Sequence, residues 1–139
     1  NIIEGVRHLR TINHEMRALT IMDSAEVYAE AKRLRAPLDL VQHIAETGKL
    51  PVPNFAAGGV ATPADAAMLV QLGAESVFVG SGIFCSGNPA KFAKAIVDAV
   101  THYQDPARLV AISRGLGTAM PSLTMESIPE ADRLAGRGW

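Results

Sequence analysis

Two short glycine-rich runs, Gly58-Gly59 and Gly80–Gly82, carry the clearest chemical signal in the sequence. Each run follows a short apolar segment and precedes a helix-start pattern, at a turn where backbone N–H groups can face an anion. Glycine lets the anion approach the backbone closely, and Ser81 adds a hydroxyl donor. One such turn alone is more often an ordinary tight turn, but two in successive units favour a phosphate site. We therefore expect Gly59, Gly80 and Ser81 to hold a phosphate group.

Other binding and catalytic motifs are absent or weak. The second glycine run is not a dinucleotide-binding fingerprint, because Cys85 stands where the third glycine is required. The sequence has no G-K-[ST] motif, which excludes a P-loop. The histidines lack the spacing of metal ligands, and Cys85 has no evident base partner. We expect neither a bound metal nor a cysteine nucleophile.

No lysine is placed as a Schiff-base former. Such a lysine is usually buried, which lowers its pKa, and none of those present lies in a predicted apolar strand. They are Lys32, Lys49, Lys91 and Lys94. Lys32 lies on a predicted helix face, where it could contact an anion, although a surface position is expected first. The same alternatives hold for Arg10 on the first predicted helix.

Composition excludes several classes of protein. The net charge is −1, so no basic excess is present to neutralise the phosphates of a nucleic acid. A single cysteine excludes an internal disulfide framework and favours a reducing, cytoplasmic location. No apolar run approaches the ~20 residues of a membrane span. With 48% hydrophobic residues, the chain of 139 residues can form a real core.

Hydrophobic spacing and capping signals predict alternating helices and strands. We expect helices over residues 2–18, 24–35, 37–48, 63–73, 89–105 and 106–117, and strands over residues 50–57 and 76–79. The helix that Thr62-Pro63 begins could also present its N-terminus to the phosphate. Residues 118–139 lack clear periodicity and are expected to form a C-terminal tail. A helical pattern from the first residues suggests that the chain begins inside a structural element of a longer protein.

The middle of the chain repeats the order strand, glycine turn, helix. This alternation predicts a parallel sheet with helical crossovers, and the turns after the last strands of a (β/α)8 barrel commonly form a phosphate site. Two strands cannot make a stable parallel sheet, since both faces and both edges need cover. We therefore expect further strands upstream of this sequence.

The residues around the glycine runs closely resemble one enzyme family. Asn54–Asp65 (NFAAGGVATPAD), Gln71–Ala74 (QLGA) and Val77–Phe84 (VFVGSGIF) are similar to the synthase subunit of glutamine-dependent pyridoxal 5′-phosphate synthase, the PdxS/SNZ family. Shorter matches are the opening NIIEGVRHLR, Leu116–Met120 (LGTAM) and the terminal Arg137–Trp139. The resemblance spans essentially the whole sequence, and its two long motifs are highly specific.

The resemblance implies an α/β fold: the C-terminal half of a (β/α)8 TIM barrel over residues 1–117, with extra helices, and a C-terminal tail over residues 118–139. It implies a lyase of vitamin B6 biosynthesis that makes pyridoxal 5′-phosphate from ribose 5-phosphate, glyceraldehyde 3-phosphate and ammonia through lysine Schiff bases. A glutaminase subunit would supply the ammonia. The synthase would form hexamers that pair into dodecamers, with no metal and no bound cofactor.

By position, Gly59, Gly80 and Ser81 match family residues that hold the sugar phosphate. Arg10 matches one associated with the triose phosphate, and Lys32 matches a basic residue of a second anion site. Family members are about twice as long, and their catalytic Asp and Schiff-base lysines would lie upstream of this sequence. The sequence also departs from the family at Pro53, Cys85 and Pro121-Ser122.

Two alternatives remain open. The chain could belong to a non-catalytic scaffold or pseudoenzyme partner that keeps the fold without the chemistry; lysines in the upstream strands would decide this. It could also belong to another phosphate-binding TIM-barrel enzyme with the same paired turns, although the long NFAAGGVATPAD match argues against that class.

Overall fold

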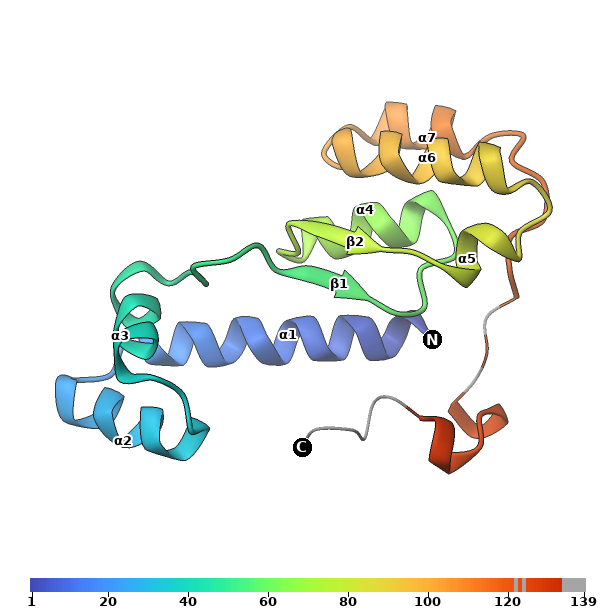
Figure 1. The fold of residues 1–139 in the computed structure, drawn as a ribbon. Coiled ribbons are helices and arrows are strands. Elements are labelled where there is room, and N and C mark those ends of the chain that lie inside the picture. The colour runs from blue at the N-terminus through green and yellow to red at the C-terminus, as the bar shows by residue number, and fades with distance from the viewer. Residues whose placement is uncertain (122, 124, 134–139) are drawn as a thin grey trace. The chain divides into compact units, whose positions relative to one another are not determined.

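The computed structural model describes residues 1–121, 123 and 125–133 (Figure 1). The chain divides into two compact units: Arg10–Asn54 forms one, and Asn1–Leu9 with the residues from Phe55 onward forms the other. Ser122 and the terminal motif Arg137–Trp139 lie outside the described residues. The structure is α/β, mostly helical, with a small parallel sheet.

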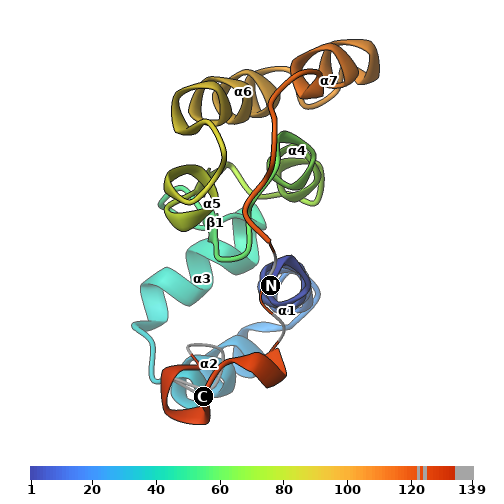
Figure 2. The same cartoon turned by 90° about the vertical axis from the view of Figure 1, so that its right-hand side faces the viewer.

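The unit that contains the glycine runs is built on two short parallel strands. Its elements are the start of α1 (Ile2–Leu19), β1 (Phe55–Ala57), α4 (Pro63–Gln71), β2 (Ser76–Phe78), α5 (Ser81–Phe84), α6 (Pro89–Thr101) and α7 (Pro106–Ser113), followed by the 3-10 turns Met125–Ser127 and Glu130–Asp132. The two strands pair in parallel, with Ala56 opposite Val77. Helix α4 contacts both β2 and α6, and Figure 2 shows α6 and α7 together above α5 and α4. The predicted parallel crossover is therefore confirmed.

Small side chains let the helices of this unit pack closely. The residues buried around the sheet and α4 are Leu9, Ala56, Val60, Ala66, Leu69, Ala74 and Ile96. On α6, Ala95 and Ala99 are also buried, and Phe92 is one of the two largest fully buried side chains among the described residues. Because alanine has a small side chain, the axes of α4 and α6 can approach closely. Helix α4 also packs against β2.

The other unit consists of the rest of α1, from Arg10 onward, and the helical hairpin that follows it. Helix α2 (Ser24–Leu34) begins at a capping box: the Asp23 carboxylate accepts hydrogen bonds from the N–H groups of Ala25 and Glu26, and the Glu26 carboxylate accepts one from the Asp23 N–H. Helix α3 (Leu38–Thr47) ends at Gly48, which adopts a left-handed conformation. Leu19, Val27, Ala31 and Val41 form its buried core.

Several predicted boundaries differ from the structure, and one of them is the end of α6, which lies at Thr101 rather than at residue 105. The first strand is Phe55–Ala57 rather than residues 50–57, because Pro51 and Pro53 cannot donate ladder hydrogen bonds. It is also less buried than expected, since only Ala56 is buried. The run Gly80–Gly82 is not an open turn, because it begins the single helical turn α5. The last predicted helix ends at Ser113 instead of residue 117.

One face of the small sheet exposes aromatic rings. The Phe55 and Phe78 side chains are 41% and 64% exposed, and their ring centroids lie 5.1 Å apart. The register places both residues on the face opposite buried Ala56. Among the described residues, each strand also has one edge without a partner strand. This apolar face with its free edges is a surface for association.

We expect the isolated chain to self-associate through this face. Light scattering should show species larger than a monomer, and Phe78→Ser should reduce them because it removes exposed apolar surface. Val97→Ser is the matched control, since Val97 on α6 is also 64% exposed. A monodisperse monomer with a cooperative melt would contradict this expectation.

Among the described residues, no helix combines the length and the apolar character needed to cross a bilayer.

Candidate functional site

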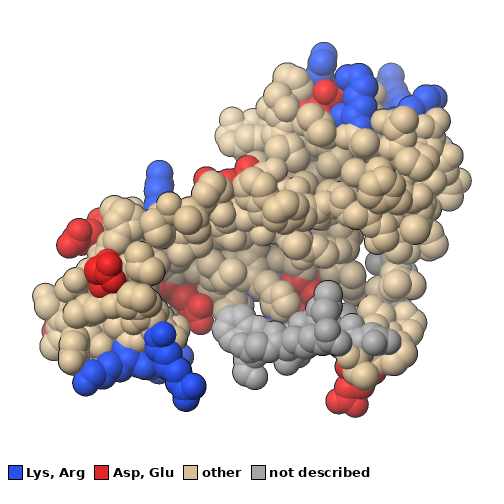
Figure 3. All heavy atoms as spheres, in the orientation of Figure 1, with Lys and Arg blue, Asp and Glu red and all other residues tan. Residues whose placement is uncertain are grey.

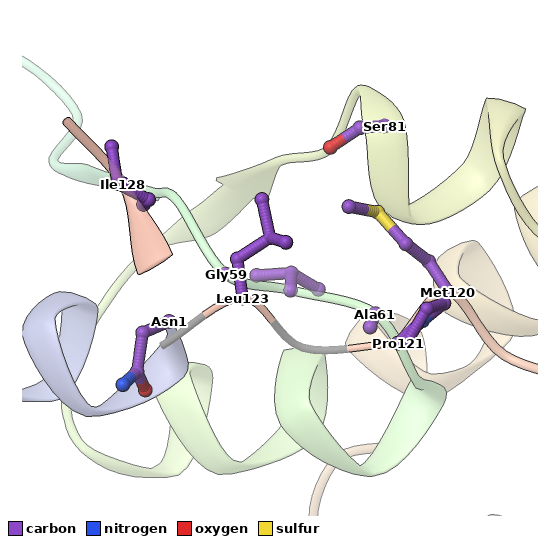
Figure 4. A pocket seen from close by; sticks show the side chains of 9 residues that line it. Asn1, Gly59, Ala61, Ser81, Met120, Pro121, Leu123 and Ile128 are labelled. Carbon is purple, nitrogen blue, oxygen red and sulfur yellow. The ribbon is translucent and has the colours of Figure 1, made fainter. Parts of the chain in front are cut away.

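A small cavity opens where the two parallel strands end. Its volume is about 120 Å³, and its walls come from the turn after β1, the start of α5 and the segment after α7 (Figure 4). The described residues that line it are Asn1, Gly59, Val60, Ala61, Ser81, Met120, Pro121, Leu123 and Ile128. The turns after both strands therefore meet at one place, as the sequence predicts for a parallel pair.

The structure brings the predicted phosphate residues together. Gly59 and Ser81 line the same cavity, and Gly80 directly precedes Ser81 as the residue that caps α5. The Gly80 carbonyl accepts hydrogen bonds from the N–H groups of Ile83 and Phe84, at 2.9 and 3.1 Å. The position of Ser81 is thus fixed by a helical turn instead of a mobile loop, which favours a defined direction for its hydroxyl.

Gly59 is required by the fold itself. Its φ is +78°, a conformation that L side chains rarely adopt. A Cβ at this position would also overlap the backbone of Asn1 and Ile2. A glycine at position 59 would therefore be needed even without a ligand.

Gly80 differs from Gly59 in this respect. A Cβ built at Gly80 meets nothing within 4 Å, and its φ of −115° lies outside the left-handed region. A Cβ at Gly80 would therefore not collide with the rest of the protein, unlike one at Gly59. The reason that the sequence offers for a glycine there is close approach of a ligand, so Gly80 is the more informative position to change.

The start of α4 (Pro63–Gln71) carries an acidic cap. The Asp65 carboxylate accepts hydrogen bonds from the N–H groups of Ala61 and Thr62, at 3.1 and 2.9 Å. The Thr62 hydroxyl in turn accepts one from the Asp65 N–H at 3.2 Å. This capping box fills the helix N-terminus with a negative group. The expectation that this helix also faces the phosphate stays a prediction, although Asp65 already occupies two of the N–H groups beside its start.

Charged side chains contribute little to the described walls of the cavity. Its described lining residues include no lysine or arginine. On α1, Arg7 donates to the Glu4 carboxylate from Nε at 3.0 Å and from Nη2 at 2.6 Å. These hydrogen bonds hold the pKa of Glu4 below its ordinary value. In Figure 3, Lys and Arg side chains gather over α6 and α7, on the outer surface of this unit. Recognition of an anion in the cavity would thus depend on N–H and hydroxyl donors.

Arg10 and Lys32, the other two predicted anion residues, belong to the second unit. Both are exposed. The Lys32 ammonium lies 4.6 Å from the centroid of the Tyr28 ring, a cation–π contact within α2. Neighbouring Arg33 pairs with Glu30 at 2.6 Å, and this pair lowers the pKa of Glu30 and raises that of Arg33. The roles of Arg10 and Lys32 toward anions stay predictions.

The sequence predicts a C-terminal tail but not which of its side chains line the cavity. Met120, Leu123 and Ile128 come from the predicted tail, and Figure 4 shows the Met120 side chain directed toward Ser81. The N–H of Gly87 donates to the Thr118 carbonyl at 2.8 Å, which ties the start of this segment to the turn after α5. No periodicity in the sequence indicates such contacts, because they join residues far apart in the chain.

The described residues place no other reactive group in the cavity. The four lysines are all exposed and none is among its described lining residues. Cys85 is a free, exposed thiol. Among the described His, Cys, Asp and Glu side chains, no group of three or more could hold a metal ion.

Fold and site together define an α/β protein with a small cavity at the carboxyl ends of two parallel strands. The family model described as the SOR/SNZ family matches residues 1–57. Relatives similar over all 139 residues are the proteins named pyridoxal 5′-phosphate synthase subunit PdxS from Herpetosiphon aurantiacus (58% identical), Protochlamydia amoebophila (58%) and Streptomyces avermitilis (58%). This chain is therefore similar to the SOR/SNZ family over its first 57 residues and to these PdxS proteins over its whole length. It covers 47%, 46% and 46% of these three proteins, so it spans about half the length of the curated relatives that it matches.

Proposed function

We propose that this chain is the C-terminal half of a pyridoxal 5′-phosphate synthase subunit, a lyase of vitamin B6 biosynthesis. The observation that carries the proposal is 58% identity over the whole chain to proteins with that name. The two parallel strands would be part of a (β/α)8 barrel over residues 1–117, and the exposed Phe55 and Phe78 would face its interior. Residues 118–139 would form the tail that lines the site. We call this chain, joined to the N-terminal half that its relatives carry, the complete synthase.

The proposed role of this half is to hold the phosphate ends of the substrates. Gly59, Gly80 and Ser81 would bind the phosphate of ribose 5-phosphate, Arg10 would contact glyceraldehyde 3-phosphate, and Lys32 would serve a second anion site. Support comes from the position of the cavity, since barrel enzymes bind phosphate in the turns that follow their last strands. Support also comes from Ser81, whose hydroxyl can donate to a phosphate oxygen beside backbone N–H groups.

The bond-forming steps would use lysines that this half does not supply. A lysine amine adds to the sugar carbonyl and loses water to form a Schiff base, and the N-terminal half would carry those lysines. A glutaminase subunit would deliver the ammonia, and the synthase would assemble as hexamers and dodecamers. The apolar wall of Met120, Leu123 and Ile128 would exclude water from the bound sugar, which strengthens the hydrogen bonds to its phosphate.

The experiment that tests this function uses the complete synthase. Ribose 5-phosphate, glyceraldehyde 3-phosphate and an ammonium salt are supplied, and formation of the pyridoxal 5′-phosphate chromophore is followed. We expect product, and we expect Ser81→Ala to raise the KM for ribose 5-phosphate. Binding of the sugar phosphate without product would instead favour the scaffold alternative, and absence of both binding and product would reject the proposal.

A further inference from the structure

Gly82 lies at the tightest backbone contact of α5. It is buried, and a Cβ built on it would overlap the carbonyl oxygen of Val60. The same Cβ would lie 3.0 Å from the Val60 carbonyl carbon and 3.1 Å from the Ala61 Cα. These are backbone atoms, so no side-chain rotation could relieve the overlap. Only glycine lets α5 lie directly on the segment that leads from β1 to α4.

The contact joins the two walls of the cavity. Val60 and Ala61 line the cavity from one side, and Ser81, the residue before Gly82, lines it from the other. Val60 is itself buried in the core of this unit, and Ile83 packs against the same core. Movement of the Val60 backbone would disturb this core, so we expect a larger residue at position 82 to displace α5 instead. The Ser81 hydroxyl would then move away from Gly59.

We propose that Gly82 is a positioning residue that sets the distance between the Ser81 and Gly59 walls, and thereby the fit of a phosphate monoester between them. This inference rests on the proposed function. Gly82 itself offers no side chain to the ligand, and it acts by letting two backbone segments touch. Gly59 differs from it, because the contact that Gly59 permits is with the first residues of α1.

The inference makes a specific prediction for Ser81. In the complete synthase, Gly82→Ala should weaken ribose 5-phosphate binding about tenfold or more, as expected when a hydrogen bond to a charged group is lost. Ser81→Ala should weaken binding by a similar factor in the parent, but by less than about twofold in the Gly82→Ala background, because the two residues act as one unit. The KM for ribose 5-phosphate should rise more than kcat falls.

The matched control is a destabilising change elsewhere in the same unit. Ala99 is buried on α6, so Ala99→Gly should lower the melting temperature without changing the affinity for ribose 5-phosphate. If Gly82→Ala does not fold, Ile83→Ala replaces it, since it loosens α5 from the core without an overlap. The same loss of the Ser81 contribution is expected with that variant.

A crystal structure of the Gly82→Ala synthase provides a readout that needs no ligand. We expect α5 to be displaced from Val60, with a wider gap between Ser81 and Gly59. Unchanged cavity walls, or a Ser81→Ala effect of equal size in both backgrounds, would overturn the positioning role. A parent synthase that does not bind ribose 5-phosphate would overturn the proposed function instead, and the crystal structure would still decide whether Gly82 sets the two walls.

Discussion

Supplied alone with ribose 5-phosphate, glyceraldehyde 3-phosphate and an ammonium salt, this chain of 139 residues is expected to form no pyridoxal 5′-phosphate. The reason is the position of its lysines. All four are exposed, and none is among the described residues of the cavity. Carbonyl chemistry through a Schiff base needs an amine that is unprotonated near neutral pH, which proteins obtain by burying a lysine or placing it beside another cation.

The positive control is the Herpetosiphon aurantiacus relative, which carries the half that this chain does not match. Product is followed by its chromophore in parallel reactions with equal amounts of protein. Formation of product by the isolated chain at the rate of that relative would show that one of the exposed lysines is catalytic. In that case Lys32, which the family resemblance places at an anion site, would be the first to replace, with Lys94 as the control.

The sequence predicts the helices of this chain well because their ends are marked locally. Asp23 with Glu26 and Thr62 with Asp65 form the predicted capping boxes, and Asn88 caps α6. Each of these signals involves residues within one turn of each other, so local chemistry decides the outcome. The parallel pairing of the strands also follows from the order of the elements.

The missed features depend on contacts between distant residues. A run rich in glycine predicts a loop, yet Gly80–Phe84 forms a helical turn, because Gly82 packs on Val60 and Ile83 on the core. The contact of Gly82 with Val60 and Ala61 cannot be predicted from the sequence, since the partner atoms belong to the backbone. The cavity wall of Met120 and Leu123 could not be found from periodicity either. The sequence thus predicts that the glycine turns of Gly59 and Ser81 meet, but it does not predict the packing that brings them together.

The Asp65 carboxylate illustrates how a local motif can support two incompatible functions. The pattern Thr62-Pro63 followed by an acid predicts a helix start, and helix starts attract anions. In the structure the acid of the motif occupies the N–H groups of Ala61 and Thr62. The capping box reduces the number of N–H groups that the start of α4 offers to a phosphate, so the glycine turns and Ser81 are the better candidates for binding.

In the complete synthase, Gly80→Val is expected to abolish measurable binding of ribose 5-phosphate while leaving the fold intact. A Cβ at Gly80 meets no atom within 4 Å, so the side chain has room in the protein. In the proposed site, the phosphate would approach that space beside Ser81, after the end of β2. Ser81→Ala should have a smaller effect, about 1.5–3 kcal/mol or roughly ten- to a hundredfold in affinity, for loss of one hydrogen bond to a charged group.

The measurement is calorimetric titration with ribose 5-phosphate, with thermal melts of every variant. Ala90→Val is the control, because it adds the same side chain at an exposed position on α6 and should leave both the affinity and the fold unchanged. Gly59→Val is the contrasting variant: it should lose stability as well as binding, since its φ of +78° and its overlap with Asn1 and Ile2 disfavour any side chain. If Gly80→Val melts like the parent and binds the sugar phosphate equally well, the phosphate site lies elsewhere.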